Sequence, residues 1–131
     1  MSKIKITFEN DYIFYAELDQ AKANKTVEIL LESLPLECQF FQSRWSGREI
    51  NTNINIDEFP PKENQSIYVS IGDICYWRDW REEVEKNINH VLAIYYGPEM
   101  ARSHVGNEPV NIIGKIDHKG LEEIIKLGEI V

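Results

Sequence analysis

Four stretches of this sequence, taken in order, decide the fold: KTVEILLESLP at 25–35, SRWSGREI at 43–50, IGDICYW at 71–77, and NIIGKI at 111–116 with GLEEIIKLG at 120–128. The first and the last repeat apolar residues at intervals of three and four, which is typical of amphipathic helices. The stretches between them have the composition of strands. This order predicts an amphipathic helix, then a set of strands, and finally a strand that leads into a second short helix.

The first helix is predicted over residues 24–34. Asn24 stands where an N-cap is useful, because its side-chain oxygen can accept a hydrogen bond from a free amide of the first turn. Pro35 ends the helix, since it has no amide hydrogen and its ring clashes with the preceding turn. The apolar stripe of the helix consists of Val27, Leu30, Leu31 and Leu34.

Alternation of apolar and polar residues predicts the strands. Residues 3–8 and 12–18 form a hairpin around a tight turn at Asn10-Asp11, and Ile50, Thr52, Ile54 and Ile56 share one face of the clearest strand. The segments 57–65, 78–87 and 100–109 are expected to be surface loops, the second of them with a turn of helix as the alternative. Further strands are expected at 38–45, 67–71, 74–77, 91–96 and 110–116.

These elements predict a mainly β fold with about eight strands and two short helices. Many short strands must hide their edges, which favours a closed β-barrel over an open sheet. The second helix carries Leu121, Ile124 and Ile125 on its apolar side and is expected to end at Gly128, with an edge strand as one prospect for the last three residues. We expect one domain over residues 1–131, a length that can bury a substantial core.

Composition excludes several classes of function. The formal net charge of −8 disfavours binding to nucleic acid and to an anionic membrane surface. No stretch approaches the roughly 18 apolar residues of a membrane-spanning helix, and the N-terminus has no signal-peptide pattern. Cys38 and Cys75 are far apart and are expected to be buried thiols in a reducing compartment. We expect a cytoplasmic protein.

The sequence resembles the cyclophilins at two places. Lys25, Thr26 and Glu28 match the Lys-Thr-x-Glu start of the cyclophilin helix, and 113–116 (IGKI) looks like the cyclophilin Phe-Gly-Lys-Val strand. The middle is similar to the small bacterial and archaeal cyclophilin-like proteins of unknown function, through Trp45-Ser46-Gly47, 71–77 and Tyr95-Tyr96-Gly97. The resemblance covers nearly the whole chain and implies a closed cyclophilin-like β-barrel capped by two helices.

Cyclophilins isomerise prolyl bonds through an arginine that hydrogen-bonds the prolyl nitrogen, and the resemblance places Arg48, or else Arg44, at that position. Stabilising the twisted amide lowers a barrier of about 18–20 kcal/mol. The phenylalanine, histidine and proline that flank this arginine in cyclophilins are missing here, and so is the Gln-Gly-Gly-Asp-Phe run that follows. We therefore do not expect an active prolyl isomerase.

The arginines gather in the middle of the chain among aromatic residues. Planar guanidinium groups beside aromatic rings suit a carboxylate or phosphate on a partly apolar molecule. The predicted ligand site is Arg48, Arg44, Trp45, Tyr76 and Tyr96. The alternative is that the rings are packing residues and the arginines pair with nearby acids such as Glu49, Asp79, Glu82 and Glu83.

No cofactor or metal is expected. The three histidines are dispersed, without the spacing of a metal site, and there is no nucleotide-binding glycine motif. The leading interpretation is a non-catalytic binding module for a small anionic molecule or a peptide. A weak peptidyl-prolyl isomerase and an interaction subunit of a larger amide-processing enzyme are the alternatives, and the sequence leaves open whether the chain forms a homo-oligomer.

Overall fold

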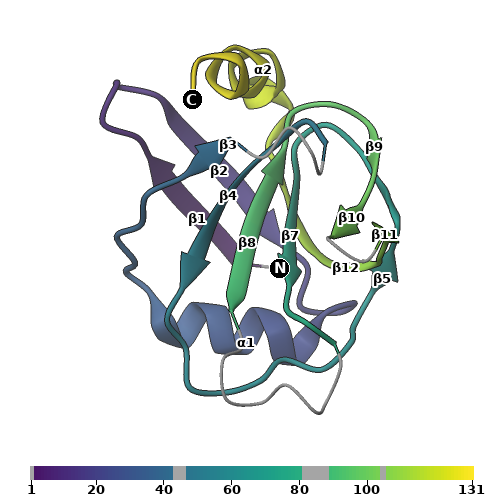
Figure 1. Cartoon of the computed structure of the whole chain (residues 1–131). Helices are drawn as coiled ribbons and strands as arrows, with labels where there is room; N and C mark the ends of the chain where they lie inside the picture. The colour runs from purple at the N-terminus through teal and green to yellow at the C-terminus, as the bar shows by residue number, and fades with distance from the viewer. Residues whose placement is uncertain (1, 43–46, 81–88, 104–105) are drawn as a thin grey trace.

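The computed structural model describes residues 2–42, 47–80, 89–103 and 106–131. A curved sheet lies between two helices, α1 (Asn24–Ser33) and α2 (Leu121–Ile130), which cover opposite ends of it (Figure 1). A short 3₁₀ turn, His118–Gly120, leads into α2. The strands are β1 (Ser2–Thr7), β2 (Ile13–Leu18), β3 (Phe41–Gln42), β4 (Glu49–Ile54), β5 (Gln65–Ser66), β6 (Tyr68–Val69), β7 (Asp73–Trp77), β8 (His90–Tyr95), β9 (Glu99–Met100), β10 (Arg102–Ser103), β11 (Gly106–Asn107) and β12 (Val110–Ile116).

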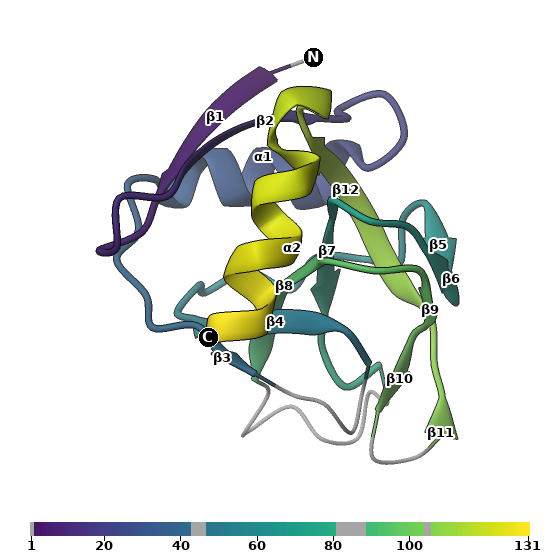
Figure 2. The same cartoon turned by 90° about the horizontal axis from the view of Figure 1, so that it is seen from above.

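The main sheet is an open half-barrel. Its strands follow the order β1-β2-β12-β7-β8-β4-β3, all neighbours are antiparallel, and β5 pairs with β12 beside this path. Figure 2 shows the sheet curling around, with β1 and β3 at its two ends. The expectation of a mainly β protein with two short helices is confirmed, but the prediction of a closed barrel is wrong.

The sheet stays open because, within the described residues, no backbone pairing joins the end strands β1 and β3. β3 is only two residues long and pairs with β4 alone. Side chains fill the space instead: Phe8, after β1, and Phe40, before β3, have ring centroids 5.5 Å apart. Apolar packing thus completes the interior where hydrogen bonds between strands are missing.

The interior of the half-barrel holds the main core. On β4 the alternation predicted from the sequence is confirmed, since Ile50, Thr52 and Ile54 are all buried. The helices add Val27 and Leu30 from α1 and Ile124 and Leu127 from α2 to the same cluster. The core is completed from β2, β7, β8 and β12 by Phe14, Ala16, Leu18, Ile74, Tyr76, Ile94, Ile113 and Ile116.

A smaller core lies on the outer face of the sheet, under the segments that carry β6 and β9. It contains Val69, Cys75, Ala93, Tyr95, Ala101 and Val110. Strand β7 is therefore buried on both faces from Asp73 to Tyr76. The expectation of a plain loop at 100–109 is wrong: this region contributes β10, β11 and part of β9, because Ala101 is anchored in the outer core.

The start of α1 differs from the prediction. Asn24 is the first helical residue and Ala23 is the N-cap, without a side-chain cap. The free amides of Lys25 and Thr26 donate instead to the carboxylate of Glu63, at 3.0 and 2.7 Å. Buried Asn111 on β12 fixes this contact, because its Oδ1 accepts from the amide of Glu63 at 3.0 Å and its Nδ2 donates to Thr26 Oγ1. A carboxylate from a distant loop replaces the local cap.

Helix α2 runs past the predicted end at Gly128, and the last residues form helix rather than an edge strand. Gly128 is needed for close packing: a Cβ there would stand 2.3 Å from the Tyr96 ring. Cys75 is buried as expected, whereas Cys38 is exposed, which corrects the prediction for that thiol. Of the segments predicted as strand at 38–45 and as loop at 78–87, residues 43–45 and 81–87 lie outside the described residues. Neither helix is long and apolar enough to span a membrane.

Candidate functional site

Arg48 lies at the end of the sheet, just before β4. Its carbonyl accepts a hydrogen bond from the amide of Tyr96 at 2.9 Å, which continues the β4–β8 ladder by one residue. Gly97 leaves room for the guanidinium, because a Cβ at Gly97 would stand 2.8 Å from Arg48 Cζ. The backbone and the missing side chain together set where this arginine lies.

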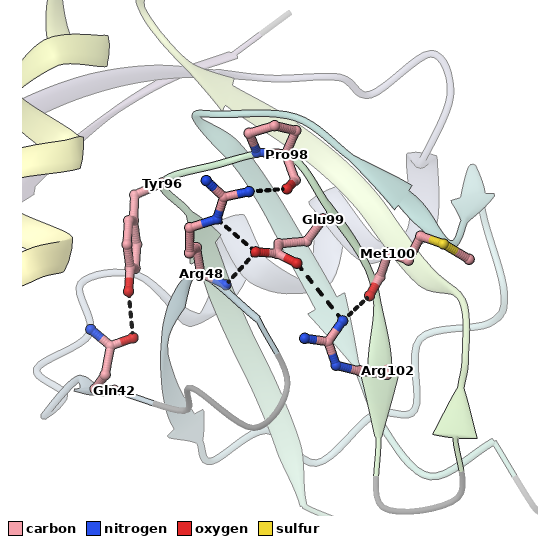
Figure 3. Close-up of polar contacts among 7 residues, drawn as sticks. All are labelled: Gln42, Arg48, Tyr96, Pro98, Glu99, Met100 and Arg102. Atoms are coloured by element: carbon pink, nitrogen blue, oxygen red, sulfur yellow. Dashed lines mark hydrogen bonds and ion pairs between the residues drawn. The ribbon is translucent and has the colours of Figure 1, made fainter.

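Two arginines far apart in the sequence, Arg48 before β4 and Arg102 in β10, lie near one carboxylate. Arg48 Nε donates to Glu99 Oε2 at 2.7 Å, and Arg102 Nη1 lies 3.8 Å from Glu99 Oε1. The Arg48 Nη2 group donates to the carbonyl of Pro98 at 2.7 Å. Figure 3 shows the two guanidinium groups on opposite sides of Glu99. We call Arg48, Glu99 and Arg102 the Arg48 cluster.

Charge is unbalanced within the Arg48 cluster. It has two guanidinium groups and one carboxylate, and the hydrogen bond from Arg48 lowers the pKa of Glu99, which therefore stays ionised well into acid. The Arg48 side chain is 55% exposed and that of Glu99 only 17%. Within the described part of the chain, Arg48 Nη1 makes no hydrogen bond. The cluster therefore presents an outward-facing donor to solvent.

Tyr96 supports the Arg48 cluster from the inside. Its ring is buried and packs against Gly128 of α2, and its hydroxyl donates to Gln42 Oε1 at 2.7 Å. The Gln42 side-chain amide in turn donates to the carbonyl of Gly128. Tyr96 thus ties α2 and β3 to the strand end that positions Arg48, as Figure 3 shows in part.

Tyr76 lies on β7, toward the end of the β7–β8 pair that is opposite to Tyr96 and Arg48. The β7–β8 register pairs Tyr76 with Leu92, four residues from Tyr96 along the chain. Its hydroxyl lies 2.6 Å from His90 Nδ1, inside the main core. Burial raises the pKa of Tyr76, and burial followed by the charge of Arg78 lowers the pKa of His90. The structure therefore brings Tyr96 to Arg48 but places Tyr76 elsewhere.

Among the described arginines, Arg78, directly after β7, is the one whose guanidinium lies over aromatic rings. Its Cζ lies 5.0 Å from the centroid of the Trp80 ring and 5.8 Å from that of Phe59. Phe59 stacks on His90 with centroids 5.5 Å apart and planes 21° from parallel. We call Arg78, Phe59, Trp80 and His90 the Arg78 cluster. The guanidinium–aromatic grouping expected around Arg48 is found here among the described residues.

Sequence reasoning missed Glu99 and did not single out Arg102, and the two remaining predicted residues, Arg44 and Trp45, lie outside the described residues. The only signal for Glu99 was its place after Tyr96-Gly97-Pro98, at a strand end. Finding its partner required the pairing of β4 with β8, since Arg48 and Glu99 are 51 positions apart.

The comparison with known families covers nearly this whole chain. Residues 6–131 match the family described as "Protein of unknown function (DUF3830)". The chain belongs to this family. No match was found among the curated proteins. The site must therefore be interpreted from its own geometry.

Proposed function

We propose that this DUF3830 member is a non-catalytic binding module for a small anionic molecule or a peptide, and that the Arg48 cluster is its site. The observation that carries the proposal is the sharing of one carboxylate by Arg48 and Arg102. Guanidinium groups form the strongest hydrogen bonds with carboxylates and phosphates. An anionic ligand could accept hydrogen bonds from the Arg48 guanidinium, whose side chain is 55% exposed.

The chemistry of the cluster favours binding over catalysis. Arg48 is held by its own backbone, by Glu99 and by Pro98, so little side-chain entropy is lost when a ligand binds. A site that is rigid before binding and exposes one donor is suited to recognition. Two carboxylates or a carboxylate and a neighbouring phosphate on the ligand would reach both guanidinium groups.

We also propose that the half-barrel is related to the cyclophilins. A helix at each end of a curved sheet, with Lys25-Thr26 in α1 and Gly114-Lys115 in β12, supports a cyclophilin-like relation for the half-barrel. We also infer a cytoplasmic location, which the free thiols of Cys38 and Cys75 support.

Citrate and inorganic phosphate are suitable probes for the Arg48 cluster. We expect citrate to shift the amide NMR signals of the β4 start and of residues 96–100, and Arg48→Ala to weaken this binding about tenfold, the loss of one charge-assisted hydrogen bond. Lys126→Ala is the matched control, because it removes one positive charge from an exposed ion pair on α2. Equal citrate binding by wild type and Arg48→Ala would refute the proposed site.

An isomerisation assay tests the alternative function. With a proline-containing peptide, we expect no acceleration at micromolar protein. Acceleration that disappears in Arg48→Ala would replace the binding module with a prolyl isomerase.

A further inference from the structure

Arg78 differs from the other described arginines in having no carboxylate partner. Arg48 and Arg102 pair with Glu99, whereas Arg78 forms no ion pair with any residue of the described segments. Its Nε donates to the carbonyl of Pro60 at 3.1 Å, and its Nη1 makes a long contact of 3.4 Å with the carbonyl of Asp79. A partly buried cation usually needs an anion, and none of these contacts supplies one.

Among the described residues, the side chains that contact the Arg78 guanidinium are the aromatic rings of Phe59 and Trp80. Trp80 is fixed by a hydrogen bond from its Nε1 to the carbonyl of Pro109 at 3.1 Å and by edge contact with Tyr76. Beneath Phe59, His90 is bonded to the Tyr76 hydroxyl, and its lowered pKa keeps it uncharged near neutral pH. Contacts with Tyr76, Pro109 and His90 thus hold the Trp80 and Phe59 rings in place, and these rings position the Arg78 guanidinium.

The Arg78 cluster has two groups that a ligand could contact, the side chain of Phe59 and the Nη2 group of Arg78. Phe59 is 49% exposed, and Arg78 Nη2 makes no hydrogen bond within the described part of the chain. An apolar ring surface thus lies beside an unused donor edge of a guanidinium. A ligand that fits both has a flat apolar part and one anionic group within a few ångströms of it.

We propose that the Arg78 cluster is a second binding site, which takes an aromatic carboxylate. The carboxylate accepts from Arg78, and the ligand's ring packs on the exposed part of Phe59. A single guanidinium matches a single negative charge, which favours a monoanion over a phosphate dianion. This site goes beyond the proposed function, because it lies at the opposite end of β7 and β8 from the Arg48 cluster.

Benzoate tests this proposal with indole NMR signals as the readout. We expect benzoate to shift the Nε1–H signal of Trp80, which Trp80→Phe identifies by its loss. Acetate, which lacks a ring, and benzyl alcohol, which lacks a charge, are expected to bind at least tenfold more weakly. Binding of acetate as tight as that of benzoate, or no benzoate shift in the wild type, would overturn the site.

Variants separate this site from the Arg48 cluster. Arg78→Lys keeps the charge but loses the planar fork, and we expect at least tenfold weaker benzoate binding with the fold retained. Phe59→Ala changes an exposed side chain, so it decides the matter if substitution of Arg78 unfolds the chain. Arg48→Ala is expected to leave benzoate binding unchanged. Unchanged benzoate binding in both Arg78→Lys and Phe59→Ala would refute the site and leave Arg78 only the structural role of holding the loop at Pro60.

Discussion

The Arg48 cluster and the Arg78 cluster occupy opposite ends of strand β8. Their guanidinium groups differ in the side chains that accompany the positive charge. At the Tyr95 end, Arg48 is paired with a carboxylate and remains exposed. At the His90 end, Arg78 lies against the rings of Phe59 and Trp80 and pairs with no carboxylate of the described residues. Both guanidinium groups are positioned by contacts to backbone carbonyls, of Pro98 and Pro60 respectively.

The difference shows that the neighbouring loop, more than the arginine itself, decides what an arginine can bind. The segment after β8, which carries β9, brings Glu99 to Arg48, so a ligand there competes with an internal anion. The loop after β4 brings Phe59 to Arg78, so a ligand there meets an aromatic ring, and no carboxylate of the described residues pairs with this arginine. The Arg48 cluster suits ligands with several charges, and the Arg78 cluster suits one charge with a ring.

The largest effect is expected from Gly128→Ala, which acts on one cluster alone. The new methyl group would overlap the buried Tyr96 ring, and overpacking of this kind costs about 1–3 kcal/mol of the free energy of unfolding. Because Tyr96 positions Arg48, citrate binding should weaken as well, while benzoate binding should not change. Urea denaturation and the two titrations measure this. Weakening of both ligands alike would show that the clusters are coupled.

Removal of single tyrosine hydroxyl groups compares how much the hydrogen bonds beside each cluster contribute to the free energy of unfolding. Tyr76→Phe leaves buried His90 Nδ1 without its partner and should cost about 1–3 kcal/mol. Tyr96→Phe breaks a bond to the partly buried Gln42 and should cost about 0.5–1.5 kcal/mol. Denaturant midpoints of the two variants give the comparison. A larger loss for Tyr96→Phe would reverse the order of anchoring.

Glu99→Gln tests whether the internal carboxylate competes with ligand. It keeps the size of the side chain but removes its charge, so citrate should bind several-fold more tightly at low salt. Stability should fall by less than about 1 kcal/mol, because the ion pair is partly exposed. Calorimetric titration measures the affinity. A weaker citrate affinity would mean that Glu99 positions the arginines rather than competing with the ligand.

The smallest expected effects are changes of stability with pH. The two clusters should lose stability in different pH ranges. His90 has a lowered pKa when folded, so the unfolded chain binds the proton more readily and stability falls as pH drops below 6.5. Glu99 also has a lowered pKa when folded, so its contribution is present above 4.5 and is lost as pH falls through the lower folded value.

Denaturant midpoints measured between pH 8 and pH 3 test these ranges. His90→Gln should flatten the decline below pH 6.5, whereas Glu99→Gln should reduce only the decline below pH 4.5. An unchanged profile for His90→Gln would show that this imidazole titrates alike in the folded and unfolded chains.

Local patterns made most of the elements predictable. The hairpin of β1 and β2, helix α1, β4, β8 and β12 each follow from periodicity within a few residues. Closure was not predictable in this way, because it depends on whether two end strands far apart in the sequence can pair. The short β3 and the Phe8–Phe40 contact replace that pairing, and neither has a local signature.

The candidate sites were predictable as residue types but not as groups. Arginines near aromatic residues are visible in the sequence, and Arg48 and Tyr96 do lie together. The grouping of Arg78 with Phe59 could not be predicted, because it depends on the loop after β4 lying beside the end of β7, where the Pro60 carbonyl accepts from Arg78, 18 positions further along the chain. The separation of two residues in the sequence does not show whether a loop folds back into contact with a distant strand.

The cap of α1 has a consequence for how the polypeptide acquires its structure. The amides of Lys25 and Thr26 need the carboxylate of Glu63, which lies 38 and 37 positions further along the chain and whose own placement depends on Asn111. A fragment cut before residue 63 would therefore carry a frayed first turn, and a nascent chain on the ribosome would complete this helix only after the last long strand had emerged.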